Sequence, residues 1–341
     1  MDEGANGTAV LEVADLSVEI SIRGTWAQAL ENVSLTIRRG EVLGLVGESG
    51  SGKSLTALSI SRLLPDNARV VGGTICLMGE DVLAKGESEL NRMRARSLAL
   101  IFQNPTSYLN PVLTVGRQLA EIFELNPELL DGHGLSRREI RRRAWRRSAD
   151  YLRLVKIPDP ERIVAMYPFQ LSGGMQQRVV IAMALARQPG LIIADEITTA
   201  LDVTIQAQIL TLLSELRRAV GMTLLLITHD MGIVAQLADR VAVMYSGSIV
   251  ECSDVRSLFK DARHPYSRAL LQTVPTIQGA QATFRPIPGA VPALTDPPSG
   301  CRFHPRCAYV LDQCSTVKPA PAVAGPGHTV ACHRFGGPAG E

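Results

Sequence analysis

The stretch GESGSGKS, from Gly47 to Ser54, decides the fold of this 341-residue chain. It fits the pattern G-x-x-x-x-G-K-[ST] of a phosphate-binding loop. The apolar run Val42 to Val46 before it predicts a strand, and the apolar stretch Leu55 to Leu64 after it predicts a helix. Glycines let backbone N–H groups converge on phosphate oxygens, and a helix N-terminus adds partial positive charge. The sequence therefore predicts a phosphate site between a strand and a helix.

The loop also supplies the side chains that a magnesium-bound nucleotide needs. Lys53 would neutralise the β- and γ-phosphates, and the Ser54 hydroxyl is suited to Mg²⁺. A glycine-rich turn without this role requires neither residue. The candidate nucleotide-binding residues of the loop are Gly47, Ser49, Gly50, Ser51, Gly52, Lys53, Ser54 and Thr56.

A second motif, LIIADE from Leu191 to Glu196, places two carboxylates after an apolar run that predicts a buried strand. Asp195 is a candidate Mg²⁺ ligand through water, and Glu196 is a candidate general base for an attacking water. The alternative is a turn at a strand end with two solvated acids. Together with the phosphate loop, the pair favours hydrolysis of a nucleoside triphosphate.

A third motif, LSGGMQQR from Leu171 to Arg178, puts Ser172, Gly173 and Gly174 at the start of a predicted helix. Backbone N–H groups at such a position suit an anion. A serine N-cap followed by glycines is also common without a ligand. With the phosphate loop, the chain has two candidate phosphate-binding helix ends.

The composition narrows the class of protein. Hydrophobic residues make up 46% of the chain and charged residues 20%, so most of the chain is expected to fold. The formal net charge of +2 gives no global attraction to nucleic acid or to an anionic membrane. No apolar run reaches the roughly 18 residues of a membrane-spanning helix. The N-terminal MDEGANG lacks the segments of a secretory signal, which predicts a cytosolic protein.

The remaining pattern predicts an α/β core with additions. Alternating apolar and polar residues from Leu11 to Arg39 predict an antiparallel β layer. Later apolar runs alternate with helical segments, as in βαβ units with a parallel sheet. Helical spacing from Leu113 to Tyr167 predicts a helical insertion. The later predicted strands are Leu98–Phe102, Leu191–Ala194, Thr223–Ile227 and the hairpin Val241–Cys252.

The helical insertion carries RREIRRRAWRR, Arg137 to Arg147, with seven arginines. Charge runs usually face solvent, so we expect an exposed helix face. A nucleic-acid contact is the alternative interpretation.

The end of the chain differs in composition. Ten of the twenty prolines lie after residue 285, which predicts a loop-rich extension held by something other than a core. Four of the six cysteines lie there, in the spacing C-x5-C-x6-C-x17-C, and suit a metal rather than disulfides in a reducing compartment. Cys76 and Cys252 fall in predicted strands and are expected to be core residues. The candidate ligands are Cys301, Cys307, Cys314 and Cys332, with His304, His328 and His333 as possible replacements.

The motifs together resemble the ATP-binding subunit of ABC transporters, from about Leu11 to Leu271. The resemblance is carried, in order, by GESGSGKS, IFQNP with Gln103, LSGGMQQR, LIIADE, TTALD ending at Asp202, and THD with His229. It implies an α/β ABC-type P-loop ATPase with a RecA-like parallel-sheet core, an antiparallel β subdomain and a helical subdomain at about 113–180. The ATPase domain would span residues 1–271 and the Cys-containing C-terminal extension residues 272–341.

The resemblance also implies how these residues act. Two such subunits stack head to tail, and each ATP lies between one phosphate loop and the LSGG segment of the other subunit. Gln103 would contact Mg²⁺ and the attacking water, His229 the γ-phosphate, and Asp202 would couple the two sites. The implied catalytic residues are Glu196, His229 and Gln103, the Mg²⁺ ligands Ser54, Gln103 and Asp195, and the LSGG-side nucleotide contacts Ser172, Gly173, Gly174 and Gln176.

Within that family, ALDVTIQAQIL from Ala200 and HPYSRALL from His264 are similar to importers of dipeptides and oligopeptides, including nickel-carrying relatives. LSGGMQQR is similar to the D-type ATPase of this group. The implied partners are two transmembrane permease subunits, a second homologous ATPase and, indirectly, an external substrate-binding protein, at the cytoplasmic face of the cell membrane. The alternatives are a nickel importer and a soluble ABC ATPase that acts on DNA or ribosomes; no nucleic-acid partner is expected.

The stretch CRFHPRC, Cys301 to Cys307, is similar to the extension of peptide-importer ATPases, some of which carry an iron–sulfur cluster. A [4Fe–4S] cluster is therefore expected before zinc, with free thiols or disulfides as the third alternative. Two features depart from the family pattern. Ile197 stands where proline is usual, and Trp26 is a candidate for stacking on adenine, with a structural tryptophan as the alternative.

Overall fold

The computed structural model describes residues 8–102, 104–130, 134–197, 202–273 and 287–335. The chain forms two compact units, which we describe separately: Met1–Gly86 with Leu225–Glu341 (unit 1), and Glu87–Leu224 (unit 2). The C-terminal extension thus belongs to the same compact unit as the first strands. The predicted division into an ATPase domain (residues 1–271) and a C-terminal extension (residues 272–341) concerns function and not compactness, and it stays a prediction.

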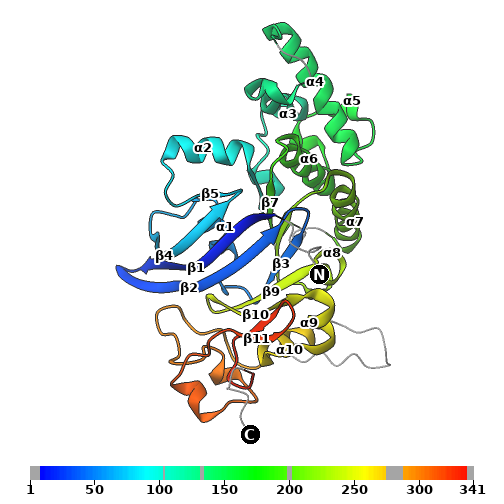
Figure 1. Ribbon diagram of the computed structural model, residues 1–341. Coiled ribbons are helices and arrows are strands. Elements are labelled where there is room, and N and C mark those ends of the chain that lie inside the picture. Colours follow the sequence, from blue (N-terminus) through cyan, green and yellow to red (C-terminus); the bar gives the residue numbers. More distant parts are fainter. Residues whose placement is uncertain (1–7, 103, 131–133, 198–201, 274–286, 336–341) are drawn as a thin grey trace, which may run out of the picture. The chain divides into compact units, whose positions relative to one another are not determined.

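Unit 1 contains an antiparallel sheet in the order β2-β1-β4-β5, as the alternating pattern predicted (Figure 1). Leu11, Val13 and Leu16 of the central strand are buried, which explains the apolar alternation. The strands are β1 (Ala9–Ile22), β2 (Thr25–Arg38), β4 (Ala68–Leu77) and β5 (Glu80–Asp81).

A second sheet in unit 1 carries the phosphate loop. In it, β3 (Val42–Val46) lies between β8 (Leu224–Thr228) and the parallel strand β9 (Arg240–Tyr245). The predicted hairpin is present, since β10 (Ser248–Asp254) pairs antiparallel with β9. The helices of unit 1 are α1 (Lys53–Ile60), α8 (Met231–Leu237), α9 (Val255–Asp261) and α10 (Pro265–Leu271).

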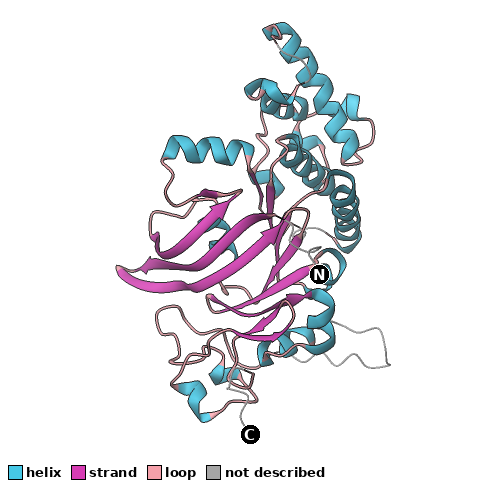
Figure 2. Cartoon of the chain, in the orientation of Figure 1, coloured by secondary structure: helices cyan, strands magenta, loops and turns pink. Residues whose placement is uncertain are grey.

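The extension continues this sheet, which the sequence analysis did not predict. Strand β12 (His328–Val330) pairs antiparallel with β10, and β11 (Ala322–Gly325) pairs with β12. The rest of the described extension consists of loops with two short 3-10 helices, η4 (His304–Arg306) and η5 (Asp312–Ser315). Figure 2 shows how little of it is regular compared with the sheets. The loop-rich prediction is confirmed for these residues, but the expectation that something other than a core holds the extension is wrong, because Phe303 packs into the apolar core of unit 1.

Unit 2 contains the parallel pair β6 (Leu98–Ile101) and β7 (Leu191–Asp195), as predicted. Between them the described chain is helical, which confirms the helical insertion. The helices of unit 2 are α2 (Glu87–Arg96), α3 (Val115–Leu125), α4 (Arg137–Leu154), α5 (Pro160–Ile163), α6 (Gly173–Ala186) and α7 (Val203–Val220), with 3-10 turns η1 (Pro105–Ser107), η2 (Pro127–Leu129) and η3 (Pro168–Gln170).

The arginine run forms the first half of α4. Its helix begins with a capping box in which Ser136 accepts from the Glu139 N–H and Glu139 reaches back to the N–H of Ser136. The buried residues of the helix are Ala144, Ser148 and Leu152, and no arginine of the run is among them. The exposed-face prediction is therefore confirmed.

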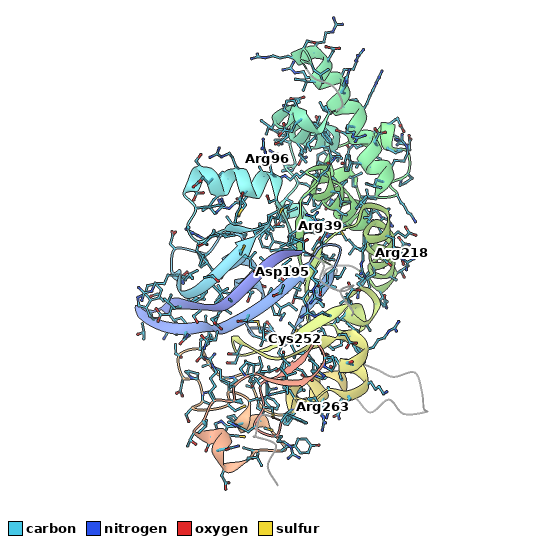
Figure 3. All side chains as sticks on the ribbon, viewed as in Figure 1. Arg39, Arg96, Asp195, Arg218, Cys252 and Arg263 are labelled. Atoms are coloured by element: carbon cyan, nitrogen blue, oxygen red, sulfur yellow. The ribbon has the colours of Figure 1, made fainter. Side chains whose placement is uncertain are left out.

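Two further predictions concern single residues and the membrane. Cys76 lies in β4 and Cys252, labelled in Figure 3, lies in β10, as expected. Both are half-buried rather than fully buried. Among the residues that the structure describes, no helix is long and apolar enough to cross a bilayer. The N-terminal segment MDEGANG lies outside the described residues.

Candidate nucleotide-binding site

The phosphate loop joins β3 directly to α1, and its glycines are needed for its shape. A Cβ on Gly47 would lie 2.1 Å from the carbonyl oxygen of Met244, and one on Gly52 would lie 2.6 Å from Cδ2 of Leu30. Gly52 is also the N-cap of α1, in the left-handed region at φ 106°, and no side chain caps this helix. Any larger residue would force the loop away from the sheet.

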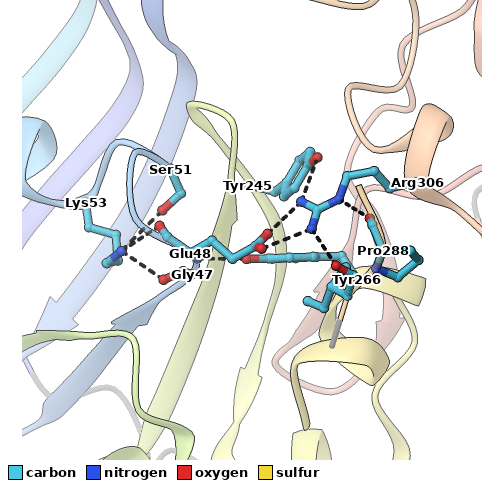
Figure 4. Close-up of polar contacts among 9 residues, drawn as sticks. Gly47, Glu48, Ser51, Lys53, Tyr245, Tyr266, Pro288 and Arg306 are labelled. Carbon is cyan, nitrogen blue, oxygen red and sulfur yellow. Dashed lines mark hydrogen bonds and ion pairs between the residues drawn. The ribbon is translucent and has the colours of Figure 1, made fainter. Parts of the chain in front are cut away.

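Lys53 holds the loop closed (Figure 4). Its buried ammonium donates to the carbonyl oxygens of Gly47, at 2.8 Å, and Glu48, at 2.9 Å, and to the hydroxyl of Ser51, at 3.4 Å. A positive charge therefore lies in the centre of the loop, where phosphate oxygens are predicted.

The other loop residues fall into two groups. Ser49, Gly50 and Ser54 are exposed, so their groups face solvent, whereas Ser51 is buried. Thr56 is fully buried, and its hydroxyl donates to the carbonyl oxygen of Gly52 at 3.0 Å. Nucleotide contacts by these residues stay predictions.

Glu48 stands at a motif position where any residue is allowed, and it is held by two residues that the sequence did not link to the phosphate loop. Its backbone N–H donates to the hydroxyl of Tyr266 at 2.8 Å, and its carboxylate accepts from both terminal nitrogens of Arg306 at 2.8 and 3.0 Å. The HPY motif gave a signal for Tyr266 without showing its partner. Arg306 lies in the quoted motif CRFHPRC, which gave no signal of its partner.

His229 lies in unit 1, in the turn after β8, and its side chain is exposed. The next residue, Asp230, caps α8 by accepting from the N–H of Gly232 at 2.7 Å. Since β8 and β3 are neighbours in one sheet, both the phosphate loop and His229 follow adjacent strands.

The acidic pair lies in unit 2. Asp195 is the last residue of β7 and is 8% exposed (Figure 3). Glu196 follows with its backbone in the left-handed region at φ 50°, a conformation that costs a non-glycine residue about 1 kcal/mol. Nearby, burial raises the pKa of Tyr108, and the charge of Asp195 contributes in the same direction. Gln103 lies outside the described residues.

The LSGG segment also lies in unit 2, where local contacts support it. Ser172 caps α6 by accepting from the Met175 N–H at 3.4 Å. The amide of Gln176 donates to the carbonyl oxygens of Pro168, at 2.9 Å, and Leu171, at 3.3 Å. Gln176 therefore braces the turn before the helix, and its predicted contact with nucleotide stays a prediction.

Two further residues of unit 2 fix helix starts. A Cβ on Gly174 would lie 2.7 Å from Cγ2 of Ile205, so only glycine fits where α6 meets α7. Asp202 caps α7 by accepting from the Ile205 N–H at 2.9 Å. Ile197, which stands in place of the usual proline, is buried, and residues 198–201 lie outside the described part.

The comparisons with known proteins agree with this geometry. Residues 30–199 match the family described as ABC transporter, and residues 250–314 match the oligopeptide/dipeptide transporter C-terminal region. A protein of Sinorhizobium fredii named as a probable peptide ABC transporter ATP-binding protein is 45% identical over 98% of this chain and 97% of its own length. This chain belongs to the ATP-binding proteins of peptide ABC transporters.

Other members of the family extend the likeness. The oligopeptide transport ATP-binding protein OppD of Salmonella typhimurium is 44% identical over 95% of this chain and 93% of its own length. The ATP-binding cassette MJ0796, solved as a dimer in a post-hydrolysis state with ADP and Pi, matches with a TM-score of 0.60 at 28% identity. That match covers 72% of this chain and 99% of the cassette. The chain is thus an ATP-binding ABC ATPase with the predicted fold class.

The extension of this ABC ATPase brings its four cysteines near one another. Burial raises the pKa of Cys301 to about 11, and the other three thiols add to this effect. Burial also raises the pKa of Cys307 and Cys332. Among the described residues, no three side chains of His, Cys, Asp or Glu are arranged tightly enough to hold a metal ion. The donor chemistry suits a metal, but the arrangement of the thiols does not form a coordination group.

Trp26 of the ABC ATPase lies on β2 with 42% of its surface exposed. The guanidinium carbon of Arg69 lies 4.0 Å from the ring centroid, so a cation covers one face of the indole. The other face is the one on which an adenine would stack, and this role stays a prediction.

Proposed function

We propose that this chain binds MgATP on residues 47–54, hydrolyses it, and thereby powers the import of dipeptides or oligopeptides. The phosphate loop carries the proposal. A side chain on Gly47 or Gly52 would collide with its neighbours, the lysine lies buried at the centre of the loop, and no side chain caps the helix that follows it. These are the features that an anion of high charge requires.

The chemistry is divided among the residues described above. Ser54 and Asp195, with Gln103, would hold Mg²⁺, since hydroxyl and carboxylate oxygens are the ligands that this ion prefers. Bound Mg²⁺ neutralises charge on the phosphates as the terminal bond breaks. Glu196 accepts a proton from the attacking water, and His229 contacts the γ-phosphate. The exposed side chain of His229 is accessible for such a contact.

The helix start at Ser172–Gly174 serves the ATP of a second ATPase subunit. Its position at an exposed helix N-terminus supports this role. We propose that the second subunit is a similar, non-identical ATPase, and that both bind two transmembrane permease subunits at the cytoplasmic face of the membrane. An external binding protein delivers the peptide. The relatives named for peptide or oligopeptide transport support this substrate class over nickel.

Copurification tests this assembly. The chain is tagged in its own cell, membranes are solubilised gently, and the bound proteins are identified. We expect two multi-span permeases and a second ATPase, with ATPase activity that rises when binding protein and peptide are added. Recovery of DNA or ribosomes in place of permeases would contradict the transport function and leave ATP hydrolysis standing.

We further propose that the four cysteines of the extension bind a [4Fe–4S] cluster, with zinc as the alternative. The support is the donor type, because four cysteine thiolates can complete the ligand set of a four-iron cluster or of tetrahedral zinc. Iron and acid-labile sulfide are measured in anaerobically purified protein, together with zinc. Cys307→Ser is expected to remove the metal. Metal-free protein with four titratable thiols would contradict the proposal.

A further inference from the structure

The extension reaches the phosphate loop through one side chain. Arg306 lies at the end of η4 and its side chain is only 4% exposed. Its two terminal nitrogens donate to the two carboxylate oxygens of Glu48, a paired geometry that adds both strength and direction. Glu48 is the second residue of the phosphate loop, and 258 positions separate it from Arg306.

The guanidinium is itself held in place (Figure 4). Its Nε donates to the carbonyl oxygen of Pro288 at 2.8 Å, one terminal nitrogen also donates to the Tyr245 hydroxyl at 3.3 Å, and the other to the carbonyl oxygen of Ile287 at 3.4 Å. Five hydrogen bonds therefore fix a group with five N–H donors. Arg306 cannot turn away from Glu48 without losing several of them.

Glu48 passes this restraint to the loop backbone. Its N–H donates to the hydroxyl of Tyr266, which is fully buried, and its carbonyl oxygen accepts from Lys53. The side chain, N–H and C=O of one residue thus have three different partners. Two of these partners lie outside the loop, and the third is the lysine predicted to bind phosphate.

The elements that present Arg306 and Tyr266 share one apolar cluster. The rings of Tyr245 and Phe303 meet edge to face with centroids 5.1 Å apart, and those of Tyr266 and Phe303 lie 5.4 Å apart. Phe303 is 3% exposed, so the extension contributes a core residue to the body of unit 1. The ion pair between Arg306 and Glu48 is therefore supported by packed apolar side chains.

We infer that Arg306 is a positioning residue for ATP binding, through which the C-terminal extension presets the phosphate loop. A loop held in its binding shape loses less conformational freedom when ATP binds, so removal of the restraint weakens affinity. The chemical step uses other residues and is unaffected. This inference rests on the proposed binding of ATP by residues 47–54.

The test compares ATP affinity with turnover in the full chain, purified with the subunits that accompany it. Arg306→Ala is expected to raise the Kd for MgATP roughly fivefold, while kcat at saturating ATP stays within about twofold of wild type. Glu48→Ala should raise the Kd by a similar factor, and the double variant should raise it no more than either single variant, because both remove one interaction. Arg306→Lys keeps the charge without the paired geometry and should restore part of the affinity.

One control variant and one milder test variant separate the possible outcomes. Lys318→Ala removes another cation of the extension, which pairs with Glu31 of β2 at 2.6 Å, and should change neither Kd nor kcat. Tyr266→Phe deletes one hydroxyl and gives a milder variant if Arg306→Ala does not fold; it too should raise Kd. Unchanged Kd in the Arg306 and Tyr266 variants, with raised Kd in Lys53→Ala, would overturn the inference alone. Unchanged Kd in Lys53→Ala would overturn the proposed ATP site as well.

Discussion

The two helix N-termini that are predicted to bind phosphate are built differently. At α1 the N-cap is Gly52, which has no side chain, and the loop before it is held by Lys53 and by distant partners of Glu48. At α6 the N-cap Ser172 accepts from an N–H of its own helix, and Gln176 braces the preceding turn.

This difference separates two ways of making an anion site. The α1 site uses a charged side chain and contacts from across unit 1, so its shape exists before the ligand arrives. The hydrogen bonds that hold the α6 site come from neighbours in sequence, its Gly174 packs against Ile205 of α7, and its N-cap hydroxyl already has a partner. The first suits tight binding of a nucleotide, and the second suits an added contact from a second subunit.

Glu196→Gln should have the largest effect, because it removes the proposed proton acceptor and no predicted phosphate contact. We expect turnover to fall at least ~10²-fold with ATP affinity unchanged. Phosphate release and equilibrium nucleotide binding measure the two quantities. Full turnover in this variant would show that Glu196 is not the general base and that ATP hydrolysis at the two helix ends does not need it.

Gly174→Ala tests the local construction of the α6 site. The new methyl group would lie 2.7 Å from Ile205, so the packing of α6 on α7 must shift, at a cost of about 2 kcal/mol. Chemical denaturation should show this loss, and ATPase activity should fall while ATP binding to the loop persists. Stability equal to that of the wild type would show that α6 and α7 accommodate the methyl group without cost, which would contradict the close packing at Gly174.

Lys53→Ala tests the charged construction of the α1 site. Deleting the ammonium removes the cation predicted to bind the phosphates, and the Kd for MgATP should rise about tenfold or more. Lys318→Ala is the matched control, because it also deletes one lysine from unit 1. Wild-type affinity in Lys53→Ala would refute the role of the charge.

The free energy of unfolding should depend on pH through a residue that lies beside the distant partners of the α1 site. Burial lowers the pKa of His264 from 6.5 to about 3. This residue lies two positions before Tyr266 and caps α10, and its backbone N–H donates to the Glu251 carboxylate. The unfolded chain therefore binds an extra proton below pH 6.5, so stability is greatest above that pH and declines toward pH 3.

His264→Asn keeps an N-capping acceptor without the titration. Between pH 7.5 and 5.5, the free energy of unfolding should fall by about 1 kcal/mol more in wild type than in this variant. Parallel pH curves for the two proteins would contradict a neutral, buried imidazole at this position.

The sequence predicted those features that depend on neighbours along the chain. The strand, loop and helix around residues 42–60, the hairpin at Tyr245 and Ser248 and the exposed face of α4 follow from periodicity and turn chemistry, which are local. The pairing of β12 with β10 was missed because a three-residue strand carries almost no pattern. The ion pair of Glu48 with Arg306 was missed because single charges far apart in a chain leave no periodic signal.

That ion pair limits how this protein can be recombined. The second position of the G-x-x-x-x-G-K-[ST] pattern accepts any residue in the pattern itself, yet here it is occupied by the partner of a C-terminal arginine. A chimera that joins this extension to another ATPase would leave Arg306 buried without a counterion unless a glutamate occupies that position. The ion pair is therefore kept in a chimera only if both of its residues, Glu48 and Arg306, are transferred together.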